Sequence, residues 1–369
     1  MIAPLEIAGR CARVRARFDQ ADALLVGDLD NIRWLTGFTG SNGWVVLGPD
    51  EVVLVTDGRY GDQAAAQLAQ AGVDGRVLVG LSSAKIFDLL AEEVGQFDSV
   101  GFEGAHLTFD QHQRFKGLFT PDLVPVGGVI EAERRYKDAG EIARMAEACR
   151  IAAAALAETV ADGLEGRTEA QVRNQLEIRM RELGATGPSY ETIVATGPIN
   201  AARPHHRPTD TVIEAGHTVI IDVGALYDGY HSDMTRTFFV GEPTEQQLQL
   251  YDIVLAAQCA GVAAVEAGLS TSQLDHVCRQ MISDAGYGEW FSHGTGHGVG
   301  LLIHEDPFIN STGDMRLQVG DVVTVEPGVY REGFGGIRVE DLVVVTDDGC
   351  HVLTTSPKDS PCPPSPPTT

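Results

Sequence analysis

The chain has 369 residues, of which 43% are hydrophobic and 21% are charged, and this composition excludes a wholly disordered protein. The formal net charge of -25 at pH 7 argues against nucleic acid and anionic membrane surfaces as partners, because both would repel an acidic protein. A chain of this length exceeds one typical hydrophobic core, so we expect two domains.

Cysteine usage and the N-terminal segment indicate a cytoplasmic protein. The six cysteines form no CxxC motif and follow no regular spacing, which is typical of reduced, mostly structural thiols. Residues 1–20 lack the apolar core of a signal peptide and have the pattern of a charged amphipathic helix. Since no stretch approaches about 18 uninterrupted apolar residues, we expect no membrane span.

The first third of the chain alternates strand and helix patterns, which predicts an α/β domain over residues 1–132. A Gly pair followed by a charge cluster, in VGGVIEAERRYKDAG, marks its C-terminal boundary. The expected strands are residues 21–27, 43–49, 51–57 and 99–102, and the expected helices are residues 5–20, an Ala-rich segment after Gly61, and 84–94.

The second domain, residues 133–355, is predicted to be α+β, because hairpin-like strands dominate and the helices are segregated between them. Asp138 and Glu141 form a capping box that opens a long Ala-rich helix. From Ser356 onward the chain is rich in Pro and Ser, so we expect a disordered tail over residues 356–369. The expected helices are residues 139–161, 168–184, 244–267 and 271–285.

A hairpin in the second domain places two aspartates on one face of its strands. Two β runs flank Asp228-Gly229, which is a strong signal for a two-residue turn. With that turn, Asp222 lies opposite Thr235, and Asp233 shares the parity of Thr235 and so lies on the same face as Asp222. Two like charges on a buried face repel each other unless a cation lies between them. The position of both aspartates on the same face therefore favours a metal site over two ordinary turn residues.

Three further candidate ligands occupy distinctive motifs. His297 lies in HGTGHGVG, where the glycines let the backbone approach closely and leave the imidazole unobstructed. Glu326 ends the run DVVTVE before a Pro-Gly pair, and Glu340 lies inside the expected strand GIRVEDLVVV, where apolar neighbours predict burial. A P-loop would need Gly-Lys-Ser/Thr after the glycines, and an HExxH zinc helix would need a second His after His304-Glu305, so both are excluded.

Together these residues form a hard, oxygen-rich donor set. A single Asp near a hairpin or a single Glu in a strand is most often a turn or solvent-facing residue, whereas several candidates in one half of the chain favour a shared site. Such carboxylates and an imidazole can hold two divalent ions, which generate a hydroxide near neutral pH and polarise a carbonyl. The pattern therefore indicates metal-assisted hydrolysis of an amide. The candidate ligands are Asp222, Asp233, His297, Glu326 and Glu340.

These motifs, in this order, resemble those of the pita-bread metallopeptidases, family M24. The combination of HGTGHGVGLLIHE, VEPGVY and GIRVED is highly specific, and the resemblance spans nearly the whole chain. In the first domain, NIRWLTGFTGSNGWVVL and VVLVTDGRY resemble the creatinase-type N-terminal domain, which accompanies the proline-specific branch of prolidase (Xaa-Pro dipeptidase) and aminopeptidase P.

The resemblance implies a role for each candidate ligand. Asp222 would be a bidentate ligand of one metal, Asp233 and Glu340 would bridge both metals, and His297 and Glu326 would complete one coordination shell each. The nucleophile would be a metal-bridging water or hydroxide. Glu326 would also carry the proton from that water to the leaving nitrogen, which suits a carboxylate beside two cations.

The resemblance also implies roles for residues around the ligands. His304 would donate a hydrogen bond to the scissile carbonyl or its oxyanion, and His205 would contact the substrate backbone. His293 would shape the site, and Arg338 would pair with a ligand carboxylate or with the substrate. His206 reads as a solvent-facing neighbour of His205.

One position near these histidines departs from the family pattern. Arg203 replaces the aliphatic residue that relatives commonly carry just before His205. We expect its guanidinium to reach solvent rather than to contact a substrate carboxylate.

The implied activity is a dinuclear exopeptidase that hydrolyses the Xaa-Pro bond of dipeptides or short peptides. An Xaa-Pro bond is a tertiary amide without an N–H, and an enzyme that uses metals and carbonyl donors does not need that group. The alternatives are an aminopeptidase P acting on longer peptides, a non-catalytic pita-bread binding protein and a creatinase-like amidinohydrolase. The donor set suits manganese or cobalt, with zinc and iron as further options. The family resemblance also implies a homodimer.

Overall fold

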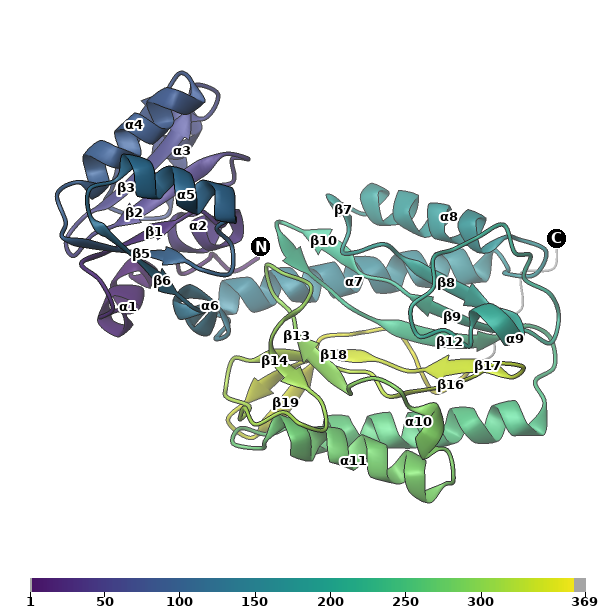
Figure 1. Cartoon of the computed structure of the whole chain (residues 1–369). Coiled ribbons are helices and arrows are strands. Elements are labelled where there is room, and N and C mark those ends of the chain that lie inside the picture. The colour runs from purple at the N-terminus through teal and green to yellow at the C-terminus, as the bar shows by residue number, and fades with distance from the viewer. Residues whose placement is uncertain (1, 362–369) are drawn as a thin grey trace. The chain divides into compact units, whose positions relative to one another are not determined.

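The computed structural model describes residues 2–361 and divides into two compact units between Arg134 and Arg135 (Figure 1). This division lies two residues from the boundary that we expected from the sequence. Within residues 2–361 no helix is long and apolar enough to cross a membrane.

The N-terminal unit is built on a mixed six-stranded sheet with the order β4-β3-β2-β1-β5-β6. Its central strands are runs of Val and Leu buried on both faces, and helices supply the covering layers. The strands are β1 (Ala23–Val26), β2 (Gly43–Leu47), β3 (Val52–Asp57), β4 (Arg76–Gly80), β5 (Ser99–Glu103) and β6 (Asp122–Val126). The helices are α1 (Arg10–Arg17), α2 (Leu29–Thr36), α3 (Gly61–Gln70), α4 (Ser83–Val94), α5 (Phe109–Leu118) and α6 (Val129–Arg134).

The C-terminal unit has helices on both faces of a central layer of strands. Its helices are α7 (Ala139–Ala161), α8 (Glu169–Glu182), α9 (Gly197–Asn200), α10 (Glu245–Ala264) and α11 (Thr271–Asp284), with the 3-10 helix η1 (Gly288–Trp290). Its first strands are β7 (Gly187–Pro188), β8 (Ile193–Thr196), β9 (Thr218–Asp222), β10 (Ala225–Tyr227), β11 (Tyr230–His231) and β12 (Thr235–Phe239). The later strands are β13 (Gly296–Gly298), β14 (Glu305–Ile309), β15 (Val322–Val325), β16 (Gly328–Arg331), β17 (Gly335–Arg338), β18 (Asp341–Thr346) and β19 (Gly349–Val352).

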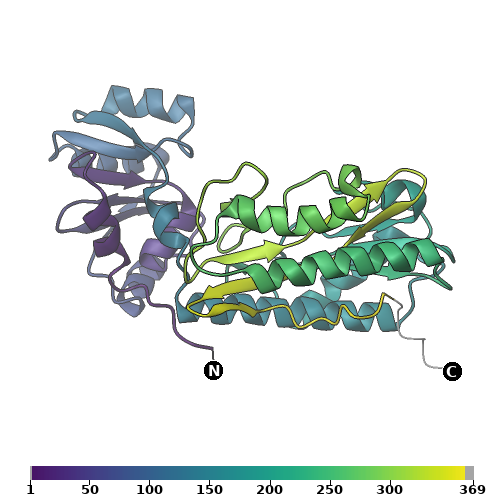
Figure 2. The ribbon, with the colours of Figure 1, turned by 90° about the horizontal axis from the view of Figure 1, so that it is seen from below.

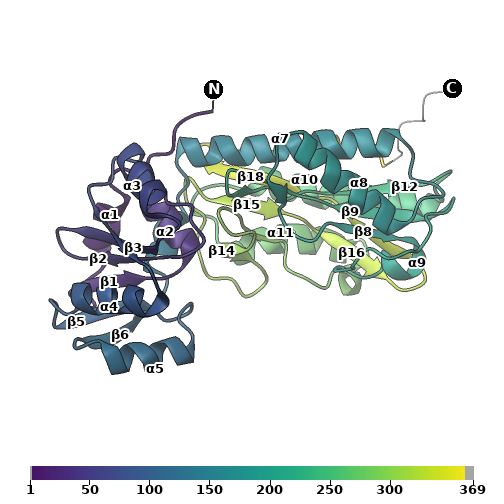
Figure 3. The same cartoon turned by 90° about the horizontal axis from the view of Figure 1, so that it is seen from above.

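Two hydrophobic cores fix this layered arrangement. α7 and α8 pack on one side of the strands, and α10 and α11 pack on the other side. Figure 2 shows α10 and α11 running across the strands from below, and Figure 3 shows α7 and α8 from above. The strands between them belong mainly to the sheets β12-β9-β8 and β14-β13-β15-β18-β19. The α+β expectation for this domain is confirmed.

The one helix cap that was predicted from the sequence is confirmed. The capping box of Asp138 and Glu141 is present, and α7 covers residues 139–161 as expected. The other long helices of this unit also begin at polar caps, with Thr168 before α8, Thr244 before α10 and Ser270 before α11. In each case the cap hydroxyl accepts a hydrogen bond from a backbone N–H of the first turn.

The C-terminal tail corrects the expectation of disorder in its first part. The backbone carbonyls of Ser356 and Pro357 accept hydrogen bonds from Arg236, and that of Lys358 accepts one from Tyr251. Pro and Ser composition predicted disorder because it offers little apolar surface to bury, but it leaves free carbonyl groups that buried donors can use. Residues 362–369 of the predicted tail lie outside the described residues.

Candidate metal centre

The predicted hairpin is present and brings two aspartates to one place. Tyr227 pairs with Tyr230 and Asp222 pairs with Thr235, which is the register expected from the Asp228-Gly229 turn. Both turn residues have positive φ, 45° for Asp228 and 75° for Gly229, as a tight two-residue hairpin turn requires.

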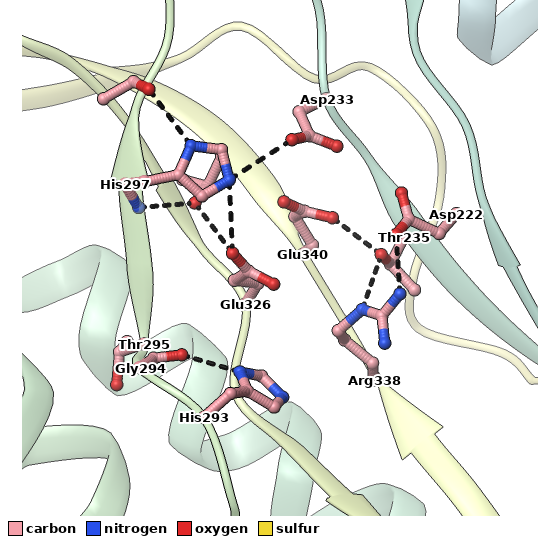
Figure 4. Close-up of polar contacts among 12 residues, drawn as sticks. Asp222, Asp233, Thr235, His293, Gly294, Thr295, His297, Glu326, Arg338 and Glu340 are labelled. Atoms are coloured by element: carbon pink, nitrogen blue, oxygen red, sulfur yellow. Dashed lines mark hydrogen bonds and ion pairs between the residues drawn. The ribbon is translucent and has the colours of Figure 1, made fainter. Parts of the chain in front are cut away.

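A third carboxylate joins them from another part of the chain. Asp222, Asp233 and Glu340 each offer an oxygen, and these oxygens all lie within 4.8 Å of one another (Figure 4). Glu340 is 1% exposed, as predicted, but it lies between β17 and β18 and not inside a strand. Its backbone N–H donates to the Thr235 carbonyl at 3.2 Å, so the chain leaves one strand pairing and enters another at this residue. This crossing lets the Glu340 side chain meet the aspartates of the hairpin.

Glu326 and His297 reach the same cavity from adjacent strands. Glu326 directly follows β15, and its backbone N–H donates to the Thr295 carbonyl at 2.8 Å. His297 lies in β13, and its Nε2 atom is 3.5 Å from both Asp233 Oδ2 and Glu326 Oε1. Figure 4 shows the imidazole facing these two carboxylates.

The glycines around His297 are required by backbone packing. A Cβ on Gly296 would collide with the carbonyl oxygen of Thr324, and a Cβ on Gly298 would collide with that of Asp306. The His297 backbone N–H donates to Thr324 Oγ1 at 3.0 Å. The motif therefore lets β13 pack closely against the neighbouring backbone at Thr324 and Asp306, and this packing fixes the position of the His297 backbone and Cβ atom.

The protonation state of His297 suits a metal ligand. Burial lowers the pKa of His297 to about 4, so the ring is neutral at pH 7. Its Nδ1 lies 3.0 Å from the Gly298 carbonyl, which can only accept a hydrogen bond, so Nδ1 carries the proton. The Nε2 lone pair then faces two carboxylates, and a bound cation would convert this repulsive arrangement into an attractive one.

The carboxylates of the cavity carry more negative charge than their surroundings can balance. Burial, reinforced by the neighbouring carboxylates, raises the pKa of Asp233 and Glu340 well above their usual range, and burial raises the pKa of Glu326 to about 7. The guanidinium of Arg338 offsets part of this charge. Because multivalent cations would stabilise the ionised forms of all these groups, the donor chemistry fits divalent metal ions.

Arg338 pairs with a candidate ligand, in agreement with one of its two predicted roles. Its Nη2 lies 2.6 Å from Asp222 Oδ2, and its Nε donates to Thr235 Oγ1 at 2.9 Å. The Thr235 hydroxyl in turn donates to Glu340 Oε2 at 2.6 Å. Arg338 also donates to the Tyr330 hydroxyl at 2.8 Å, so its hydrogen bonds position other groups of the site.

Tyr190 is a site residue that the sequence did not reveal. Its hydroxyl contacts an oxygen of Asp222 and lies 2.5 Å from Asp233 Oδ1, so it links the two hairpin aspartates. Tyr190 precedes β8 in the segment PSYETIV, where neither spacing nor neighbours distinguish it from an ordinary packing residue. Tyr190 is identified as a site residue only by its contacts in the structure.

The remaining predicted residues surround a cavity of about 410 Å³ that contains all the candidate ligands. The rings of His304 and His297 meet edge to face with centroids 4.4 Å apart. Exposed His205 and partly buried His293 also line the cavity, and His293 Nε2 lies 3.0 Å from the Tyr330 hydroxyl.

His206 corrects the expectation of a solvent-facing neighbour. It is 6% exposed, and its Nε2 lies 2.9 Å from Glu169 Oε2, a fully buried carboxylate at the start of α8. The same carboxylate oxygen accepts hydrogen bonds from the backbone and side chain of Thr209. His206 therefore anchors the loop that carries His205. Arg203 in the same loop is exposed, as expected.

Comparisons with known proteins agree with this architecture. Residues 143–347 match metallopeptidase family M24, and residues 10–136 match the creatinase/prolidase N-terminal domain. The chain is 38% identical to the Xaa-Pro dipeptidase of Pyrococcus furiosus over 276 residues, which are 74% of this chain and 79% of that protein.

Two solved structures are similar over nearly their whole length. The Xaa-Pro dipeptidase from Bacillus anthracis superposes with a TM-score of 0.93 at 38% identity, covering 96% of this chain and 99% of that one. The X-Pro aminopeptidase from Thermotoga maritima superposes with a TM-score of 0.87 at 34% identity, covering 94% and 99%. The family acts with divalent metal ions, and the donor set described above fits them. The chain thus belongs to metallopeptidase family M24 and carries the N-terminal domain shared by creatinases and prolidases.

Proposed function

We propose that this metallopeptidase is an exopeptidase that hydrolyses the Xaa-Pro bond of dipeptides and short peptides with two divalent metal ions. The main support is structural: oxygens of Asp222, Asp233 and Glu340 lie within 4.8 Å of one another. His297 and Glu326 face the same cavity. Similarity to Xaa-Pro dipeptidases over most of the chain supports the substrate class. The full donor set favours this activity over a non-catalytic binding protein or a creatinase-like amidinohydrolase.

The five candidate ligands would hold the ions. Asp222, Asp233, His297, Glu326 and Glu340 all line the cavity and would supply the ligand atoms. Manganese is the proposed metal because oxygen donors dominate, and cobalt, zinc or iron would also bind such a set. When bound, the ions polarise the scissile carbonyl and lower the pKa of water.

Glu326 is the proposed proton carrier. Burial raises the pKa of its carboxyl to about 7, so near neutral pH it can both accept and release a proton. The Thr324 hydroxyl donates to Glu326 Oε1 at 3.2 Å and orients the carboxyl within the cavity. Glu326 would take the proton from the attacking water and deliver it to the proline nitrogen, which becomes an amine when the bond breaks.

Two histidines would bind the substrate around the scissile bond. His304 and His205 line the cavity on exposed segments, where their rings can donate hydrogen bonds to carbonyl oxygens of a bound peptide. Apolar side chains of Ile193, Ile303 and Phe308 also line the cavity and offer a surface for the proline ring. We further propose that the enzyme acts in the cytoplasm, as its cysteine pattern indicates, and that it forms a homodimer, as the family resemblance implies.

A substrate series tests this proposal. Chelator-treated protein resupplied with Mn²⁺ should release proline from Ala-Pro and should not cleave Ala-Ala. Cleavage of Ala-Pro-Ala at a higher kcat/KM than Ala-Pro would move the assignment to an Xaa-Pro aminopeptidase. Equal hydrolysis of Ala-Ala would contradict proline specificity.

The proposed role of Glu326 has a matched control. Glu326→Gln should lower kcat for Ala-Pro by at least about 100-fold, because general acid-base catalysis commonly contributes 10²–10⁴-fold. Glu332→Gln changes an exposed glutamate of the same domain and should retain wild-type kcat. Equal activity of the two variants would remove Glu326 from the mechanism.

A further inference from the structure

A buried polar cluster lies next to the metal centre along the chain. Arg236 directly follows Thr235, Asp341 directly follows Glu340, and the two form an ion pair of 2.8 Å with side chains 2% exposed. Gln258 of α10 donates to Asp341 Oδ2 at 3.0 Å. Lys358 completes the cluster, because its ammonium donates to Gln258 Oε1 at 2.7 Å and pairs with Asp341 Oδ2.

This cluster holds the backbone at or near three candidate ligands. Arg236 Nη1 donates to the carbonyls of Thr235 at 2.9 Å and Glu340 at 2.5 Å. Gln258 Nε2 contacts the Val325 carbonyl at 3.4 Å, directly before Glu326. The cluster therefore acts on the backbone within two residues of Asp233, Glu326 and Glu340.

The C-terminal segment Ser356–Pro361 lies against the cluster and accepts hydrogen bonds from it. Arg236 donates to the Pro357 carbonyl at 2.9 Å and to the Ser356 carbonyl at 2.6 Å. Further along, the Tyr251 hydroxyl donates to the Lys358 carbonyl at 2.7 Å, and the backbone N–H of Phe239 donates to the Pro361 carbonyl at 2.8 Å. Since the match to family M24 ends at residue 347, no role of this segment follows from that match.

We propose that the C-terminal segment Ser356–Pro361 is a structural part of the metal centre, with Lys358 as a positioning residue that sets its affinity for divalent ions. The inference rests on the proposed assignment of Asp233, Glu326 and Glu340 as ligands. Lys358 acts through other residues: it donates to Gln258 and pairs with Asp341, Asp341 pairs with Arg236, and Arg236 donates to the backbone carbonyls of Thr235 and Glu340. Groups that orient metal ligands typically change metal affinity by about 10–100-fold when they are removed.

The physical reason is that loss of Lys358 removes a hydrogen bond from each of two buried acceptors, although Asp341 keeps its ion pair with Arg236. Gln258 Oε1 and Asp341 Oδ2 would both lose a charge-assisted hydrogen bond. Either Gln258 must turn toward water or Asp341 must shift, and each movement is passed to Val325 or to Arg236. Small shifts of ligand strands weaken metal binding before they unfold a domain, because coordination tolerates only narrow geometry.

Two C-terminal truncations and three point variants test the proposal, with the Mn²⁺ dissociation constant measured by calorimetry on chelator-treated protein. Lys358→Met and a chain ending at Thr355 should each weaken Mn²⁺ binding by about tenfold or more. A chain ending at Pro361, which keeps the segment, and Lys116→Met, which changes an exposed lysine of the other unit, should bind like the wild type. Lys358→Arg should restore most of the affinity, because the charge returns.

Separate readouts distinguish this proposal from a general loss of stability and from the proposed function. The thermal midpoint of metal-free Lys358→Met should fall, because buried acceptors lose hydrogen bonds, but should stay above the temperature of the titration, and KM for Ala-Pro at saturating Mn²⁺ should not change. Wild-type Mn²⁺ affinity in both Lys358→Met and the chain ending at Thr355 would overturn the inference while leaving the peptidase assignment intact. A wild-type protein that binds no Mn²⁺ would instead overturn the ligand assignment and the inference together.

Discussion

Tyr190 places a single hydroxyl between two acidic candidate ligands. Its proton can be donated to Asp222 or to Asp233 but not fully to both, so one aspartate is left to accept from another partner. Asp222 has that partner in Arg338. Tyr190 therefore orients the pair while leaving oxygen lone pairs free for a cation.

Removal of this hydroxyl should weaken the metal site without disturbing the fold. Tyr190→Phe keeps the ring and removes the two contacts to the aspartates, so we expect Mn²⁺ affinity to fall by about tenfold. Calorimetric titration of metal-free protein measures this change. Tyr227→Phe, in the hairpin of the same domain, is the control and should bind Mn²⁺ like the wild type. An unchanged Mn²⁺ affinity in Tyr190→Phe would show that the Tyr190 hydroxyl does not contribute to metal binding and that the residue only packs beside the site.

His293 provides a pH-dependent contribution to stability. Burial, with a contribution from the charge of Arg338, lowers the pKa of His293 to about 4, whereas an unfolded histidine titrates near 6.5. Between these values the unfolded chain binds a proton at this residue and the folded chain does not. The free energy of unfolding therefore falls as the pH falls from 6.5 toward 4.

We expect this single residue to contribute a loss of about 2 kcal/mol between pH 7 and pH 5. Urea unfolding of chelator-treated protein at the two pH values measures the loss. His293→Gln should reduce the difference by about that amount, while His351→Gln, at an exposed position of β19, should not. The same pH dependence in all three proteins would show that His293 is accessible to protons in the folded state.

At the scale of single elements, the β9–β12 hairpin determines whether the aspartates meet. Gly229 has φ of 75°, where a β-branched residue is strained, and the turn fixes the register that pairs Asp222 with Thr235. A slip of one residue in one arm of the hairpin would turn one aspartate away from the face that carries the other. The turn is thus a structural requirement of the metal site.

Substitution of this glycine should destabilise the domain and loosen the site together. Gly229→Val should lower the free energy of unfolding by about 1–2 kcal/mol, since a side chain in a left-handed conformation costs this amount. Asp228→Asn keeps an Asn-Gly turn and should be nearly neutral, because the exposed ion pair that it loses with Arg144 contributes little. Chemical denaturation of the two variants gives the comparison, and equal stability would contradict the strained-turn argument.

Elements with a strong local signal could be predicted from the sequence, and elements defined by tertiary contacts could not. The turn chemistry of Asp228-Gly229 and the cap at Asp138 depend on neighbouring residues alone, so both were predicted correctly. The edge strands β4 and β6 were missed because their sequences, RVLVG and DLVPV, contain at most three consecutive apolar residues, fewer than the run that identifies a buried strand. The position of Glu340 in a crossing between strands likewise depends on the distant Thr235.

At the scale of the whole molecule, the ligand types were predictable because each stands in its own sequence motif. Strand geometry predicted their convergence only for Asp222 and Asp233, and for the other three ligands a shared site was expected from their number in one half of the chain and from the family resemblance. The cavity itself is assembled from loops and strand ends far apart in the sequence, so Tyr190 and the contacts of His206 were found only in three dimensions. The same holds for the segment Ser356–Pro361, whose carbonyl groups satisfy donors from α10 and β12.

We propose that two divalent ions in this cavity confer Xaa-Pro hydrolysis. The most direct test is a titration of chelator-treated protein with Mn²⁺, in which bound metal per chain and the rate of proline release from Ala-Pro are measured on the same samples. We predict that two ions bind per chain and that Ala-Pro hydrolysis reaches its maximum as the second site fills. Binding of two ions without proline release, or full activity in protein that retains no metal, would contradict the account.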